Sequence, residues 1–111
     1  MALVTVAATQ MACSWDIEGN VARAEKLVRD AAAKGAQIIL IQELFQTPYF
    51  CIDQSPEHFD LAQTLEDSPL IKHFSALAKE LDVVLPLSFF ERGGNAHYNS
   101  LVMMDADGEV L

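Results

Sequence analysis

The pattern of hydrophobic and polar residues predicts a strand, a helix and a second strand in the first 41 positions. Residues 3–9 (LVTVAAT) are rich in β-branched side chains, which is typical of a strand. Apolar residues then recur at helical spacing over 17–34, directly after Asp16, a residue that favours helix N-caps. Gly35 ends this predicted helix, and the apolar run 36–41 predicts a short strand covered on both faces. This order predicts a right-handed parallel crossover.

The second half of the chain repeats the alternation after an irregular segment, residues 42–67. Loops of this length in compact domains are usually functional or mobile. Ser68 and Pro69 supply an N-cap and a first-turn proline for a second helix that ends near residue 81. Residues 83–90 and 97–104 predict two strands joined by a turn, and 109–111 predict the start of a fifth strand. The predicted fold class is therefore α/β, in the order strand-helix-strand-helix-strand-strand.

The last predicted strand coincides with the end of the chain. A terminal apolar strand leaves an unpaired sheet edge, and the two predicted helices have only one sheet to cover. We therefore expect residues 1–111 to be the front part of a larger α/β domain, truncated at Leu111.

Composition and charge narrow the classes of partner. The chain has 111 residues, of which 51% are hydrophobic and 21% charged, a composition that fits one globular domain and argues against disorder. Seven basic and 16 acidic residues give a net charge of −9. This charge excludes a basic nucleic-acid surface and is compatible with a cationic substrate. No apolar run approaches the roughly 20 residues of a membrane span, and no charged signal-peptide start precedes Arg23. We expect a cytoplasmic protein with reduced thiols.

Glu43 is the strongest candidate for chemistry. It follows an apolar parallel strand, and ligand sites in open α/β sheets lie at the carboxyl ends of strands. Aromatic and proline residues follow it, so we expect partly dry surroundings that suit a general base. The competing interpretation is a solvated glutamate at a strand end.

The remaining reactive residue types have simpler interpretations. Cys13 and Cys51 have no neighbouring basic residue in the sequence to form a thiolate, and we expect both to pack as inert, at least half-buried thiols. His58, His73 and His97 show no metal-ligand spacing, which predicts surface or packed histidines and no metal site. Residues 105–108 (DADG) resemble part of a calcium loop but lack its later ligands, so we expect a turn.

Four segments together resemble the nitrilase superfamily of carbon–nitrogen hydrolases. Residues 36–45 (AQIILIQELF) resemble its glutamate-bearing strand, and VAATQM at 6–11, LSFFE at 87–91 and YNS at 98–100 strengthen the match. Residues 43–51 (ELFQTPYFC) and the DADG turn look more specifically like the N-carbamoylputrescine amidase branch. Gln42 stands where many members have proline, and this branch tolerates glutamine there.

The resemblance implies a fold, a mechanism and a set of site residues. The fold is the N-terminal portion of a nitrilase-like α-β-β-α sandwich. The mechanism is hydrolysis of a cationic ureido substrate through a covalent thioester, with Glu43 as general base, no metal or organic cofactor, and a homo-oligomeric full-length enzyme. Family members are more than twice this length, and their lysine and nucleophilic cysteine lie beyond Leu111, so Cys51 is not that cysteine. Tyr49 is a candidate for lining the substrate cavity, and Asn99 for supporting Glu43.

A non-catalytic protein is the alternative. The sequence has no nucleophile beside Glu43, which favours a small α/β binding or regulatory module. The end of the chain inside a predicted strand favours a hydrolase fragment instead.

Overall fold

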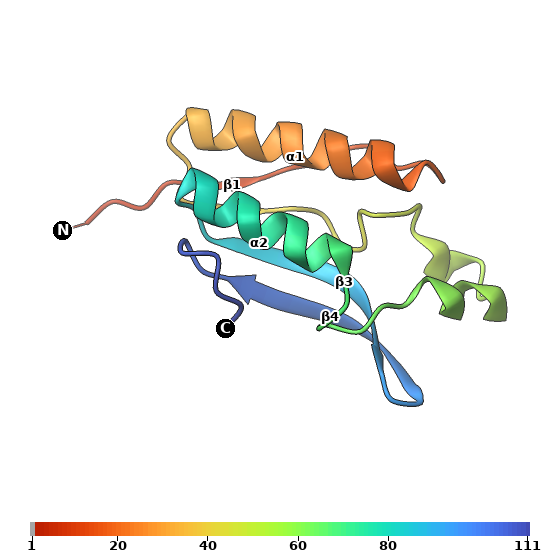
Figure 1. The fold of residues 1–111 in the computed structure, drawn as a ribbon. Helices are drawn as coiled ribbons and strands as arrows, with labels where there is room; N and C mark the ends of the chain where they lie inside the picture. The colour runs from red at the N-terminus through yellow and green to blue at the C-terminus, as the bar shows by residue number, and fades with distance from the viewer. Residues whose placement is uncertain (1) are drawn as a thin grey trace.

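The computed structural model describes residues 2–111 and contains the predicted order of helices and strands (Figure 1). Residues 56–61 and 50–52 of the predicted irregular segment form short 3-10 helices. The elements are β1 (Val6–Ala8), α1 (Ile17–Ala33), β2 (Ile38–Leu40), η1 (Phe50–Ile52), η2 (Pro56–Leu61), α2 (Pro69–Leu81), β3 (Leu85–Gly93) and β4 (Ala96–Met104).

Side chains cap the first turns of both α-helices, as the sequence predicts. The Asp16 carboxylate accepts a hydrogen bond from the Gly19 amide at 3.1 Å, and the Ser68 hydroxyl accepts one from the Ile71 amide at 3.3 Å. These bonds satisfy amide groups that have no partner within the helix. Gly35, at φ +95°, ends α1 in a conformation that most side chains disfavour.

The four strands lie side by side in the order β1-β2-β3-β4. β1 and β2 pair in parallel, as predicted. A parallel bridge between Ile38 and Val84 joins β2 to the start of the β3 strand, and the Ile39 amide donates to the Val84 carbonyl at 3.0 Å. β3 and β4 form an antiparallel hairpin whose register pairs Phe90 with Asn99.

Both α-helices cover one face of this sheet (Figure 1). The core between them is built on Ile39, Leu85 and Leu87 of the strands and on two phenylalanines, Phe45 and Phe74. The rings of these phenylalanines meet edge to face with centroids 5.4 Å apart, a favoured aromatic geometry. Neither helix of the described chain is long and apolar enough to span a bilayer.

The opposite face of the sheet is open, and this corrects one prediction. The 36–41 run was expected to be covered on both faces, yet Leu40 is 44% exposed, because no element of residues 2–111 packs over it. Val6 and Leu101 on the neighbouring strands are 67% and 56% exposed. The fifth strand is also shorter than predicted: only Val110 bridges to Met104. The apolar side chains on this face of the sheet are therefore open to solvent in residues 2–111.

Candidate active site

Glu43 lies three residues after the end of β2 and begins a turn. The next residue, Leu44, adopts a positive φ of 49°, which is uncommon for a bulky side chain. The Leu44 amide donates to the Ser88 hydroxyl of β3 at 3.0 Å and so holds the turn against the sheet. The buried Asn20 of α1 anchors the same turn, because its side-chain amide donates to the Gln46 carbonyl at 2.9 Å. The sequence did not predict that Ser88 and Asn20 hold this turn, because neither spacing nor composition links them to Glu43.

The carboxylate of Glu43 accepts a hydrogen bond from the Asn99 side-chain amide of β4. The sequence named both residues, and the structure brings them together across 56 positions of chain. Glu43 is exposed, so the partly dry surroundings that we expected are wrong for residues 2–111. Phe45 packs in the core against Phe74 and Phe50 is buried in η1, which leaves the carboxylate open to solvent. The catalytic role of Glu43 and the supporting role of Asn99 stay predictions.

The Tyr49 hydroxyl lies near the same carboxylate. The negative charge of Glu43, and to a smaller extent the Cys51 thiol, raise the pKa of Tyr49. Tyr49 is half exposed and is not among the residues that line the hollow around Glu43, so its role in lining the substrate cavity stays a prediction. Cys51 is exposed, which corrects the expectation of a packed thiol. Cys13 is partly buried, its thiol donates to the Phe45 carbonyl at 3.1 Å, and burial raises its pKa.

A shallow hollow of about 340 Å³ surrounds Glu43 on the open face of the sheet. Asn99 and Leu101 of β4 and Ser88 of β3 form one wall, and the residues at the end of β2 form the other. No Lys, Arg or Cys is among the described residues that line it. Gln42 helps to fix the wall at the end of β2, because its side-chain oxygen accepts a hydrogen bond from the Met11 amide at 2.7 Å. The hollow therefore holds one candidate base and hydrogen-bonding groups, without a nucleophile.

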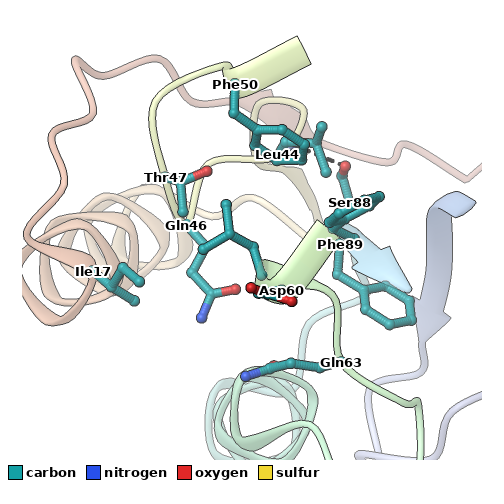
Figure 2. A pocket seen from close by; sticks show the side chains of 11 residues that line it. Ile17, Leu44, Gln46, Thr47, Phe50, Asp60, Gln63, Ser88 and Phe89 are labelled. Atoms are coloured by element: carbon teal, nitrogen blue, oxygen red, sulfur yellow. Dashed lines mark hydrogen bonds between the residues drawn. The ribbon is translucent and has the colours of Figure 1, made fainter. Parts of the chain in front are cut away.

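A second cavity, of about 220 Å³, lies between the start of α1, the 44–63 segment and β3. Figure 2 shows Gln46, Thr47 and Asp60 around it, with Phe50 and Phe89 at its margins. Of the described residues, Ser88 lines both this cavity and the hollow around Glu43, but Glu43 does not line this cavity.

The histidines are packed or surface residues, as predicted. His58 lies between Trp15 and Phe50, with ring centroids 5.6 and 5.4 Å away. His73 contacts the Glu25 carboxylate at 2.5 Å on the helical layer, and His97 stacks on Phe59. Among residues 2–111, no three His, Cys, Asp or Glu side chains are close enough to hold a metal ion.

The predicted turn at residues 105–108 is also confirmed. The Gly108 amide donates to the Asp105 carbonyl at 2.9 Å and closes it. Gly108 has φ +88°, a conformation that favours glycine.

Comparison with known proteins places this geometry in a family. The carbon-nitrogen hydrolase family matches residues 5–111. An N-carbamoylputrescine amidase of Solanum lycopersicum is 58% identical over 98% of this chain and 36% of its own length. A citrullinase of Francisella tularensis is 45% identical over the whole chain and 39% of its own length. The crystal structure of a carbon-nitrogen hydrolase from Helicobacter pylori G27 superposes with a TM-score of 0.86 at 30% identity, covering 96% of this chain and 37% of that one.

These matches confirm the resemblance that the sequence motifs indicate, and they confirm the predicted α/β fold. The chain spans little more than a third of the length of the curated relatives that it matches. Because the family matches nearly every residue, the chain belongs to the carbon–nitrogen hydrolases.

Proposed function

We propose that this chain is the N-terminal part of an N-carbamoylputrescine amidase, with Glu43 as its general base. The contact between the Glu43 carboxylate and Asn99, at the carboxyl end of a parallel strand, is the observation that carries the proposal. The identity of 58% to the tomato amidase supports the choice of substrate. Membership of a hydrolase family argues against the small non-catalytic module.

In the proposed enzyme, residues outside this chain supply a cysteine, a lysine and the side chains that cover the open face of the sheet. The hollow around Glu43 needs a cysteine thiol as nucleophile and a lysine to stabilise the oxyanion, and the described residues that line it include neither. The relatives are almost three times as long as this chain, which leaves ample sequence for both groups. The same additional residues would cover the exposed Leu40 and Leu101 side of the sheet.

The proposed reaction balances with one water molecule. Glu43 takes the thiol proton, and the thiolate attacks the ureido carbonyl carbon to form a tetrahedral oxyanion. The proton passes from Glu43 to the terminal nitrogen, ammonia leaves, and a thioester to the remaining carbamoyl group is left. Glu43 then takes a proton from water, whose oxygen attacks the thioester carbonyl. The carbon–sulfur bond breaks, and the leaving thiolate takes the proton back from Glu43, which regenerates both the thiol and the carboxylate. The released carbamic acid separates into putrescine and carbon dioxide.

The position of Glu43 after a parallel strand and its contact with Asn99 support a role in both proton transfers. Near neutral pH a thiol is mostly protonated, so a base within hydrogen-bond reach is required for attack. The Asn99 amide donates to one carboxylate oxygen, which leaves lone pairs on the carboxylate to accept a proton. In this proposal Asn99 orients the Glu43 carboxylate and leaves it able to accept the thiol proton.

Ammonia release by the full-length protein tests the proposal. We expect hydrolysis of N-carbamoylputrescine, much slower hydrolysis of citrulline, and none by residues 1–111 alone. Citrulline carries the same ureido group, so it separates ureido chemistry from recognition of the rest of the substrate. A full-length protein that hydrolyses citrulline faster than N-carbamoylputrescine would contradict the substrate assignment. Cytoplasmic localisation, homo-oligomerisation, and the absence of nucleic-acid and membrane partners stay predictions.

A further inference from the structure

An aromatic hollow lies beside the candidate active site. Residues of η1, η2, the turn between them and β3 enclose about 340 Å³, and three phenylalanine rings lie there beside the polar side chains of Gln54, Ser55 and His58. The ring of Phe90 contacts Phe50 with centroids 4.9 Å apart and stacks on Phe59 at 6.4 Å. Cys51 and Pro56 complete the wall. Phe59 is 52% exposed, so part of its ring is open to a ligand.

Two contacts connect this aromatic hollow to Glu43. Phe90 is the register partner of Asn99, whose amide binds the Glu43 carboxylate. Directly paired residues on neighbouring strands have Cβ atoms about 5 Å apart on one face of the sheet. The second connection runs through Cys51 and Tyr49. Cys51 lines the aromatic hollow and lies near the Tyr49 hydroxyl, and this hydroxyl lies near Glu43. A substrate with its ureido group at Glu43 can therefore extend past Asn99 toward the ring of Phe90.

Charge around the aromatic hollow favours a cation. Residues 36–71 contain six acidic residues and no Lys or Arg. Asp53 and Glu57 belong to the same wall-forming segment and are exposed. Arg92 lies two residues beyond Phe90 but does not line the hollow. Among the described residues no Lys or Arg lines the hollow, and His58 is its one imidazole. A carboxylate therefore meets no permanently charged partner there, whereas an alkylammonium group meets ring faces in a negative field, both of which attract it.

We propose that Phe50, Phe59 and Phe90 form the subsite for the positively charged end of the substrate. The ureido group lies at Glu43, the alkyl chain crosses Asn99, and the ammonium group rests against the ring of Phe59. This subsite rests on the proposed function and makes the enzyme selective for N-carbamoyl amines over ureido compounds that end in a carboxylate or a methyl group.

Kinetics of the full-length enzyme with two matched substrates test the subsite. N-carbamoylputrescine carries the ammonium group, and N-butylurea has the same alkyl chain without it. We expect Phe59→Ala and Phe59→Leu to lower the ratio of kcat/KM for N-carbamoylputrescine to that for N-butylurea by about 3- to 30-fold, the range of a cation–π contact. Phe59→Tyr keeps a ring and should preserve the ratio. Ile52→Ala is the control, because Ile52 is exposed in the same segment but does not line the hollow.

The outcomes separate the subsite from the proposed function. An unchanged ratio in Phe59→Ala, or an equal loss for both substrates, overturns the subsite. A wild-type enzyme that hydrolyses neither substrate overturns the proposed function instead. In that case calorimetric binding of butylamine decides the subsite: binding to wild type that is weakened in Phe59→Ala supports it, and equal binding to both contradicts it.

Discussion

Replacement of Asn99 tests the arrangement around Glu43 most specifically. The Asn99 amide donates to the Glu43 carboxylate, and Asn99→Ala removes that donor while leaving the carboxylate in place. A hydrogen bond to a charged group contributes about 1.5–3 kcal/mol. Both side chains are exposed in residues 2–111, so water replaces part of the bond and the lower end applies. About 1.5 kcal/mol corresponds to a loss of roughly tenfold in kcat.

A second variant at the same position separates orientation from charge. Asn99→Asp puts a carboxylate beside Glu43, and repulsion between like charges favours the protonated form of the pair. The acidic limb of the pH–rate profile should therefore move to higher pH, whereas Asn99→Ala lowers kcat with a smaller movement of that limb. Ammonia release from N-carbamoylputrescine, followed across pH in the full-length enzyme, measures both effects.

Thr64→Ala is the matched control for these variants. The Thr64 hydroxyl donates to the Asp67 carboxylate at 3.2 Å, and neither residue lines the hollow around Glu43. It should leave kcat unchanged, because it removes a hydroxyl-to-carboxylate bond away from Glu43. If Asn99→Ala keeps kcat within twofold of wild type, then Asn99 does not orient the base and the role given to it here is wrong.

Three further predictions concern the core, the tyrosine and the open face. Phe74→Ala should lower the free energy of unfolding by about 3–5 kcal/mol, since Phe74 is fully buried against Phe45; chemical denaturation measures this, and a loss below 1 kcal/mol would contradict the packing. Because the Glu43 carboxylate raises the pKa of Tyr49, Glu43→Gln should lower it toward the ordinary value of 10.0; phenolate absorbance during titration follows the change, and an unchanged midpoint argues against their proximity. Residues 1–111 alone should bind hydrophobic dyes and self-associate through the open face, and Leu101→Lys should weaken this in sedimentation; a monomeric chain with one sharp, concentration-independent unfolding transition would contradict it.

The order of the elements could be predicted from the sequence because its signals are local. Asp16 and Ser68 mark helix starts through bonds to amides three residues away, and Gly35 marks a helix end through its own backbone. Strand length is different, since it depends on partners. Residues 3–5 have strand-forming side chains, yet β1 begins at Val6, where pairing with Ile38 begins.

The site could be predicted only in part, because its geometry also depends on partners that are distant in the sequence. Position after an apolar strand singled out Glu43, and family motifs added Tyr49 and Asn99. The bond from Leu44 to Ser88 spans 44 positions and depends on how β2 and β3 align, which no local pattern encodes. The conformation of residues 50–61 depends on ring contacts with Phe90 and His97 in a distant hairpin. The sequence therefore left this segment irregular.

Glu43→Gln in the full-length enzyme tests the central claim most directly. Gln keeps the size and shape of the side chain but cannot accept the thiol proton, and loss of a general base typically costs about 100- to 10,000-fold in rate. Glu91→Gln is the matched control, because it changes a carboxylate of the same hairpin that binds Ser100. We predict that Glu43→Gln hydrolyses N-carbamoylputrescine at least about 100-fold more slowly, with thermal unfolding close to that of wild type. Near-normal turnover in Glu43→Gln would show that Glu43 is a solvated residue at the end of a strand.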